Sequence, residues 1–324
     1  MTSAVMGETV VEARRRLREA LLEAGGVVGD GKSAAAASPP LQTPFGIAEP
    51  VEGREVTAVA VGAPLRESRD AAFADGIQRY IVEGRIGVTP IIRAYVGAAV
   101  LDRRDRGLLP AKHEAEEFIV APLERLTDAT VARLHETGLP VHDCGVAERE
   151  HPILDVQLAV QQIEQRRRRA EVSVVAAFRR EFPDAWIVVD GSLRAYDEEA
   201  RESRLLGVIK SHETQFLAGV DLETALTLPE AHRTTVFRRV GGREDAIHSW
   251  YLRLWDWVGQ DILFGLVRVE RQRGPQVLDE IEEICSWLLA ERSPMSTPDT
   301  RWDRLLYPIH EVENYLKARA GSWW

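Results

Sequence analysis

Cysteine is scarce in this chain: Cys144 and Cys285 are the only two among 324 residues. They lie far apart and in no motif spacing, so the sequence excludes a disulfide framework and favours a reducing compartment. Long apolar runs are also missing, because no window approaches about 18 continuous apolar residues, which excludes a membrane-spanning helix. The N-terminus lacks a cationic stretch followed by an apolar core, so we expect no signal peptide and a cytoplasmic protein.

Positive charge is in deficit. Lysine and arginine number 41 against 51 acidic residues, and the formal net charge is -10. No global basic field therefore attracts nucleic acid, and any DNA contact needs a local basic patch or a metal ion that offsets the acids. Arginines do cluster at 14–16, 166–169 and 238–239, although such clusters are more often solvated faces of helices or strands.

The chain is long enough for one large domain or two modest ones, and its patterns divide it at about residue 50. Residues 1–50 carry an amphipathic helix over 8–25 and an Ala-, Gly-, Ser- and Pro-rich linker over 29–50. The helix either contacts a partner or docks on its own domain. Residues 51–324 alternate strands and helices, which predicts an α/β domain with one mixed central sheet flanked by helices. Its predicted strands cover 56–61, 91–100, 186–190, 205–210, 234–240, 247–255 and 262–270, and its predicted helices cover 128–135, 154–182, 276–291 and 309–319.

Two aspartate-glycine pairs each follow an apolar run. Asp190 ends the strand that begins at Trp186, and Asp75 follows a similar run from Ala71. If both strands belong to one sheet, their carboxylates converge at one edge, and Glu171 on the intervening helix adds a third. Three carboxylates are hard oxygen ligands suited to Mn²⁺ or Mg²⁺, and two such ions would activate water against a phosphodiester.

The same residues have a structural interpretation, which the spacing leaves open. Aspartate-glycine pairs are common in turns, so Asp75 and Asp190 could each open one. Glu171 could then serve as an ion-pair partner for the arginines at 166–169.

Five short segments, taken in order, resemble the NurA nuclease family over about residues 55–320. No single segment is specific, but their order and spacing match. They are Val-Val-Asp-Gly-Ser-Leu at 188–193, Gly-Val-Ile-Lys-Ser-His at 207–212, Ser-Trp-Tyr-Leu-Arg-Leu at 249–254, Gly-Leu-Val-Arg-Val-Glu at 265–270 and Leu-Tyr-Pro-Ile-His at 306–310.

This resemblance implies an RNase H-like fold with additional C-terminal strands and helices. It implies a homodimeric, Mn²⁺-dependent nuclease that processes DNA ends with a HerA-type hexameric translocase, as a 5′→3′ exonuclease with possible single-strand endonuclease activity. The metal-binding acids would be Asp75, Glu171 and Asp190. His310, which follows the Tyr-Pro pair, would add a ligand or base, although the family's usual histidine lies further along the helix. The segment 1–50 lies outside the shared domain and would contact the translocase.

Two basic residues fit the same expectation. Lys210, at the end of the strand after Asp190, would contact the scissile phosphate or position the attacking water. Arg253, in an aromatic strand, would clamp the DNA backbone. An adaptor that keeps the fold, binds DNA and a translocase and cleaves weakly is the alternative, because the first acid motif and the histidine depart from the family pattern. A phosphatase ranks below both, since Val188 and Ser192 occupy the positions where its second acid is expected.

Overall fold

The computed structural model describes residues 2–28, 47–65, 69–104, 107–146, 151–196, 204–212, 214–240, 246–274, 277–293 and 302–323. Within these residues the chain builds one 13-stranded sheet. The strands are β1 (Val27–Val28), β2 (Ile47–Pro50), β3 (Ala58–Ala60), β4 (Ala71–Ile86), β5 (Thr89–Arg104), β6 (Gly107–Ala121), β7 (Val141–Asp143), β8 (Trp186–Asp190), β9 (Leu205–Ile209), β10 (His232–Thr234), β11 (Phe237–Val240), β12 (Ile247–Arg253) and β13 (Leu266–Gln272). The helices are α1 (Thr2–Glu23), α2 (Asp128–Glu136), α3 (Pro152–Glu181), α5 (Gly219–Leu226), α6 (Val277–Glu291) and α7 (Tyr307–Ala320).

The centre of the sheet has the strand order β6-β5-β4-β8-β9. β5 runs antiparallel to β4 and β6, whereas β8 runs parallel to both β4 and β9. A three-stranded meander followed by two parallel strands on the side of the first strand is the arrangement of an RNase H-like sheet. The predicted fold class is thereby confirmed, and β13, β12, β11 and β2 extend the sheet beyond β9.

The first long strand tests one of the two interpretations of Asp75. If Asp75 opened a turn, the strand from Ala71 would end there, but β4 continues through Asp75 and Gly76 to Ile86. Its neighbour β5 pairs with it along almost its whole length, and this pairing holds the Asp-Gly pair extended. The turn interpretation of Asp75 is therefore wrong.

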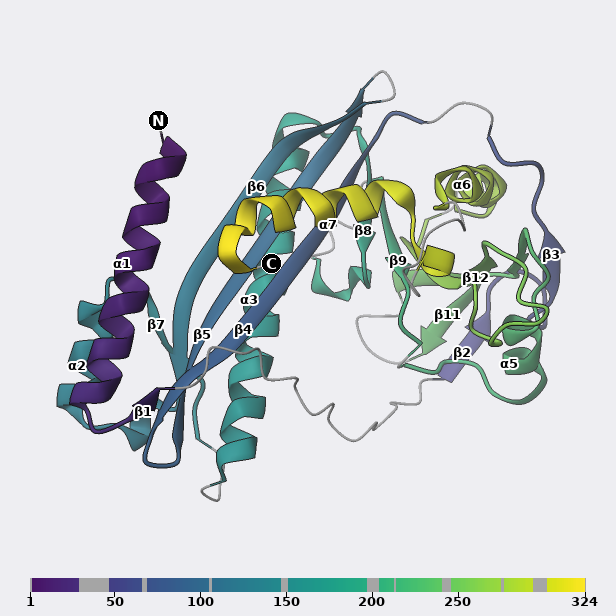
Figure 1. The fold of residues 1–324 in the computed structure, drawn as a ribbon. Helices are drawn as coiled ribbons and strands as arrows, with labels where there is room; N and C mark the ends of the chain where they lie inside the picture. Colours follow the sequence, from purple (N-terminus) through teal and green to yellow (C-terminus); the bar gives the residue numbers. More distant parts are fainter. Residues whose placement is uncertain are drawn as a thin grey trace.

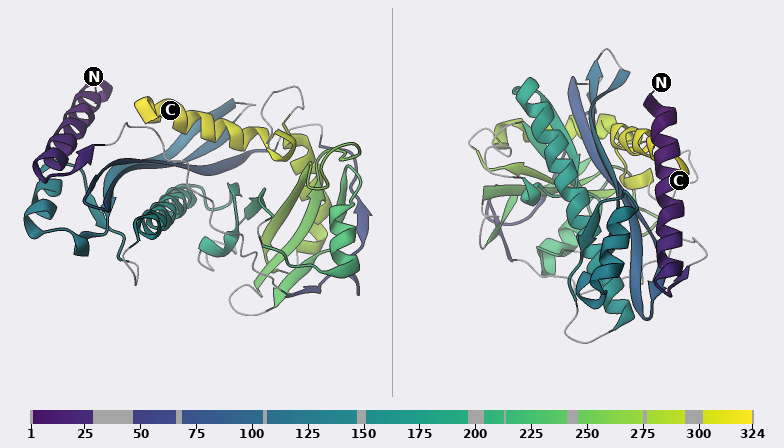
Figure 2. Two further views of the ribbon diagram at one scale, coloured as in Figure 1. Left: turned by 60° about the horizontal axis from the view of Figure 1, so that its bottom comes forward. Right: turned by 90° about the vertical axis from the view of Figure 1, so that its left-hand side faces the viewer.

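Helices cover both faces of the central strands. α3 packs on one face, where Val174 and Phe178 meet Ala72 and Ala74 of β4. α7 packs on the other face of β4, and there the alternate residue Phe73 contacts Trp287 of α6. Figure 2 shows α3 and α7 on opposite sides of the long strands. Each face of β4 is thus buried beneath a helix.

The N-terminal helix docks on its own chain. Leu17 and Leu21 of α1 are fully buried against residues of β5, β6 and α2, including Ile91 and Ile119. Figure 1 places α1 at the end of the sheet opposite β11 and β12. Residues 29–46 of the predicted linker over 29–50 lie outside the described residues. The last four residues of that linker form β2, which pairs with β11. That end of the linker was wrongly predicted, because strand pairing overrides its loop-like composition.

The remaining predicted helices and strands are found with shifted ends. α3 begins at Pro152, whose missing N–H suits a first helical position, and it stops just before Phe182 and Pro183. The predicted strand over 234–240 is split into β10 and β11. β6 was not predicted, because its charged and alanine-rich sequence lacks a clear two-residue period. None of the helices in the described ranges has the length and hydropathy that a membrane span requires.

Candidate active site

Two aspartates lie abreast at the centre of the sheet. Parallel pairing sets Ala74 of β4 opposite Val189 of β8, so Asp75 and Asp190, the next residue on each strand, are neighbours. Both alternate with residues that face α7, so both carboxylates lie on the α7 face. Asp75 is buried, and the Asp190 side chain is 21% exposed. The sequence predicted that these two acids converge if both strands belong to one sheet. The two strands are neighbours in one sheet, and the acids do converge.

Local sequence explains why Asp190 sits at the end of its strand. The four residues from Trp186 to Val189 are all buried, and Asp190 is the first position of β8 that reaches solvent. Gly191 then takes a φ of 121°, a conformation that residues with side chains rarely adopt. The chain turns sharply there, which leaves the carboxylate at the carboxyl end of a parallel strand.

Lys210 pairs with Asp190. β9 lies next to β8, and Lys210 is the residue directly after β9. The Lys210 ammonium lies 2.6 Å from Asp190 Oδ2. Burial by itself would lower the pKa of Lys210, but the charges of Asp190 and Asp75 raise it above its ordinary value. The lysine is therefore a cation at neutral pH, as the predicted contact with a phosphate requires.

Asp75 is held in an environment that opposes its ionisation. Burial, and then the charges of Asp190 and Glu171, raise the pKa of Asp75 well above its usual range, although Lys210 works in the opposite direction. The backbone N–H of Gly76 donates to Asp75 Oδ1 at 2.7 Å. A carboxyl with so little solvent and so much neighbouring negative charge gains strongly from a further cation.

Glu171 approaches from the α3 face. A side chain at position 76 would collide with the Glu171 carboxylate, so Gly76 is what allows this acid to rest on the backbone of β4. Arg167, one helical turn earlier, donates to Glu171. Burial raises the pKa of Glu171 to about 7 against the effect of Arg167. Glu171 thus serves both interpretations of the sequence, since it pairs with an arginine of the 166–169 cluster and also borders the two aspartates.

Two further residues border the acids, and neither was predicted. Tyr196 is buried, and its pKa is raised first by that burial and then by the charges of Glu171 and Asp75. Glu313 of α7 contributes to the raised pKa of Lys210 and pairs with Lys317 at 2.8 Å. The i, i+4 spacing of Glu313 and Lys317 on a helix was visible in the sequence, but nothing local indicated which strand the helix covers.

His310 lies on α7, the helix that also carries Glu313. Its Nδ1 lies 3.9 Å from Glu313 Oε2, and its side chain is 15% exposed. Its role as a ligand or base stays a prediction.

Arg253 is not a DNA contact. The side chain is fully buried, and its guanidinium donates to four backbone carbonyls, among them those of Leu228 and Ile262. Burial lowers the pKa of Arg253 to about 10. The prediction failed because β12 is buried along its whole length, so an alternating pattern did not mark an exposed face.

The donor set suits a hard divalent ion, but the present placement leaves the acids engaged with cations. Carboxylate oxygens from Asp75, Glu171 and Asp190 match what Mn²⁺ and Mg²⁺ prefer. Lys210 pairs with Asp190 and Arg167 with Glu171. Among the described residues, no three His, Cys, Asp or Glu side chains are placed so that they could hold one ion together. Glu171 also lies on the α3 face of β4, whereas the two aspartates lie on the α7 face. Binding of one ion by all three acids therefore requires the Glu171 carboxylate to move as well as the two cations to give way.

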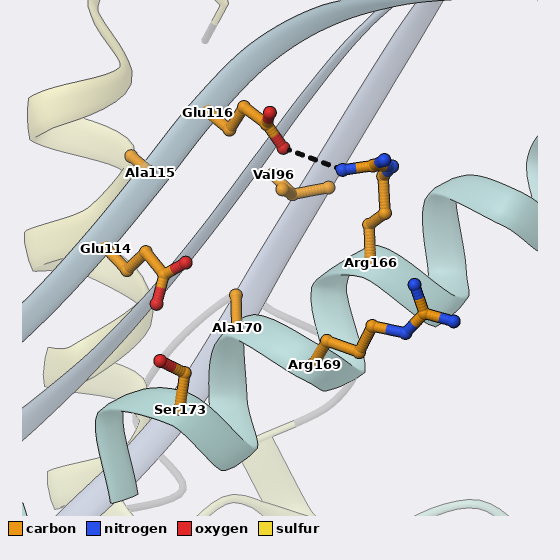
Figure 3. A pocket seen from close by; sticks show the side chains of 8 residues that line it. All are labelled: Val96, Glu114, Ala115, Glu116, Arg166, Arg169, Ala170 and Ser173. Atoms are coloured by element: carbon orange, nitrogen blue, oxygen red, sulfur yellow. Dashed lines mark hydrogen bonds and ion pairs between the residues drawn. The ribbon is translucent and has the colours of Figure 1, made fainter. Parts of the chain in front are cut away.

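A cavity of about 210 Å³ lies on a different side of α3 from Glu171, against β5 and β6. Figure 3 shows Arg166 reaching Glu116 across it, with Glu114 and Ser173 at its other end. Arg169 also lines the cavity, so two arginines and two glutamates balance its charge. None of the predicted acids opens into it.

No family model matches the chain, and no curated protein matches it. Among solved structures, it is similar to the NurA nuclease from Sulfolobus solfataricus, with a TM-score of 0.44 and 12% identity over 78% of this chain and 81% of that chain. It is also similar to the catalytic domain of human Endonuclease V, with a TM-score of 0.35 and 12% identity over 96% of each chain. Likenesses this distant assign neither a family nor an activity.

Proposed function

We propose that this chain is a divalent-metal-dependent deoxyribonuclease, a phosphodiester hydrolase that processes DNA ends. The observation that carries the proposal is the position of Asp75 and Asp190 abreast on adjacent parallel strands, with Glu171 resting against Gly76 beside them. Buried carboxylates this close to one another are costly without a cation, and a site that binds divalent ions explains why they are grouped.

Asp75, Glu171 and Asp190 would hold two ions, Mn²⁺ or Mg²⁺. Such ions supply a water nucleophile at neutral pH and neutralise the charge of the leaving oxygen. The protein's own part is to keep the acids ordered beneath α3 and α7 and to limit the access of bulk water to Asp75, which is only 7% exposed.

Lys210 would act as a cation and not as a general base. Because Asp190 and Asp75 raise its pKa, it stays protonated over the neutral pH range. When ions take over Asp190, the freed ammonium can bind a non-bridging oxygen of the scissile phosphate. His310 would support the site through Glu313 on the same helix.

The partners we propose are DNA, a HerA-type hexameric ATPase and a second copy of this chain, in DNA repair or anti-phage defence. Their support is the ordered set of sequence segments that resembles the NurA family. Polarity is expected to be 5′→3′, with single-strand endonuclease activity as a further possibility.

One observation favours a second candidate, an adaptor that binds DNA and a translocase but cleaves weakly. Asp190 is paired with Lys210 and Glu171 with Arg167. If those pairs persist in the presence of divalent ions, the acids serve the fold alone.

Cleavage of end-labelled linear DNA with MnCl₂, with and without a HerA-type ATPase, tests the proposal. We expect Asp190→Ala to reduce the rate at least about a hundredfold, because it removes a ligand of the ions that would stabilise the charge developing on the leaving oxygen. Asp184→Ala is the matched control, because Asp184 is an exposed acid just before the other end of β8. Equal rates for wild type and Asp190→Ala, or no cleavage by either protein under both conditions, would reject the nuclease proposal and favour the adaptor.

A further inference from the structure

Arg167 lies between two acceptors that belong to different elements. One turn further along α3, the Glu171 carboxylate accepts from its Nη1. On β4, Gln78 Oε1 accepts from its Nε at 3.2 Å. The side chains of Arg167 and Glu171 are 22% and 12% exposed, so solvent screens their ion pair only in part. The guanidinium thus joins α3 to the strand that carries Asp75.

Gln78 and Gly76 lie on one face of β4. They are two residues apart on a continuous strand, so alternation places both on the face that α3 covers. Gly76 leaves the space that the Glu171 carboxylate occupies, because a Cβ at this position would collide with that carboxylate. Gln78 holds the guanidinium next to the same space. The carboxylate is therefore enclosed between the backbone of β4 and Arg167.

This placement keeps Glu171 apart from the other two acids. Asp75 alternates with Gly76 along β4 and lies on the opposite face, under α7, as does Asp190. Within the part of the chain that the structure describes, no three acidic side chains are placed to hold one ion. Glu171 can join the aspartates in binding an ion only if its carboxylate leaves the guanidinium. A charge-assisted hydrogen bond is lost in that exchange, so Arg167 competes with the ion.

The next arginine of α3 supplies charge without this contact. Successive side chains project about 100° apart around a helix, and Arg168 accordingly pairs with Glu164 on another side of α3. Burial raises the pKa of Glu171, and the charges of Arg167 and Arg168 both oppose that rise. Arg168 is therefore a matched comparison for Arg167, since both place a cation near Glu171 and only Arg167 touches it.

We propose that Arg167, anchored by Gln78, is a positioning residue that holds Glu171 on the α3 face and so limits how much this acid contributes to divalent-ion binding. The inference rests on the proposed function for the ion. Without the guanidinium, the half-enclosed carboxylate has no cation of its own and gains more from an ion. Arg167 acts on the ion only through Glu171, which separates a positioning role from a general effect of charge.

Binding of Mn²⁺ without nucleic acid tests this proposal independently of cleavage. Electron paramagnetic resonance measures free Mn²⁺ during titrations of wild type, Arg167→Met and Arg168→Met. We expect Arg167→Met to bind Mn²⁺ about tenfold more tightly than wild type, since it removes a charge-assisted hydrogen bond that competes with the ion. Arg168→Met should stay within about twofold of wild type. The titrations are run at about pH 8, because loss of Arg167 raises the pKa of Glu171 beyond about 7 and a proton would otherwise compete.

A double-mutant cycle with Glu171→Gln is the second part of the test. In the Glu171→Gln background, Arg167→Met should change the Mn²⁺ affinity no more than Arg168→Met does in wild type. A tenfold gain that persists in this background, or equal affinities for Arg167→Met and Arg168→Met, would refute the positioning role. Gln78→Leu keeps the charge and removes only the anchor, so it should tighten Mn²⁺ binding about threefold. It gives the same comparison if Arg167→Met does not fold.

The two proposals fail in different ways. If Asp190→Ala binds Mn²⁺ like wild type, or if none of these proteins binds Mn²⁺, the ion site is rejected together with the role of Arg167. If Mn²⁺ affinity depends on Asp190 and is the same with and without Arg167, only the positioning role is rejected.

Discussion

At the scale of single residues, the site is a balance between carboxylates and the cations that hold them. Asp75 and Asp190 share Lys210, and Glu171 is paired with Arg167. Each cation offsets repulsion among acids that the fold forces together. A divalent ion would do the same with more charge, so lysine and metal should compete for Asp190.

We predict that Lys210→Met lowers the free energy of unfolding by about 2 kcal/mol in EDTA, because it leaves Asp75 and Asp190 without their cation. The side chains of Lys210 and Asp190 are 25% and 21% exposed, so the loss should be smaller than for a fully buried pair. Adding Asp190→Asn to Lys210→Met should restore most of the lost free energy of unfolding. Urea unfolding of the two single variants and the double variant measures this coupling.

The same variant tests the competition. MnCl₂ should raise the melting temperature of Lys210→Met more than that of wild type. Lys112→Met is the control, since Lys112 pairs with the exposed Glu181 away from the acids. Equal shifts in all three proteins would contradict a metal site at Asp190.

The positions of Asp190 and Lys210 at the ends of apolar strands could be predicted from the sequence, because that signal is local. The structure pairs the two residues, and their roles in a site stay predictions. Arg253 failed because its environment depends on which elements cover β12. Glu313 was missed because its relation to Lys210 exists only once α7 lies across the sheet.

At the scale of elements, α1 belongs to the body of the protein. Leu17 is fully buried against the sheet and α2, while Leu22 on the same helix is 61% exposed. Of the two interpretations of the first helix, docking on its own domain describes this structure.

Leu17→Ala should lower the free energy of unfolding by about 3 kcal/mol, because it opens a cavity in a closed cluster. Leu22→Ala removes the same atoms from a solvated position and should change stability by less than about 0.5 kcal/mol. Chemical denaturation followed by circular dichroism compares them. Equal small effects would mean that α1 docks only loosely in solution.

At the scale of the whole molecule, two buried titrating groups have opposite effects on how stability depends on pH. Burial lowers the pKa of His212 to about 4, and nearby Arg304 and Arg268 act in the same direction against its bond to the Leu266 carbonyl. Its folded pKa is below the unfolded value, so it contributes stability that is full above about pH 6.5 and is lost as pH falls toward 4. Glu171, with a pKa of about 7, has the opposite effect. Its contribution to stability is lost as pH rises from about 4.5 to 7.

Between about pH 4.5 and 6.5 these two contributions should partly cancel, each being worth up to about 3 kcal/mol. In His212→Gln, where the amide can still donate to the Leu266 carbonyl, stability should fall more steeply with rising pH than in wild type. In Glu171→Gln it should fall less steeply or rise. Urea titrations in EDTA at a series of pH values measure both slopes, and parallel curves for the three proteins would show that neither group titrates as described.

The sequence by itself determined the α/β class, the long helix that becomes α3, the buried strand that delivers Asp190 and the break at Gly191. These follow from periodicity and backbone preference, which act over a few residues. Only the tertiary structure decided that β4 runs on through Asp75, that β4 and β8 pair in parallel, and that Glu171 reaches them across Gly76. It also decided that Arg253 is internal. The physical reason is that pairing between distant strands and the coverage of their faces depend on the packing of the whole sheet, which no local pattern records.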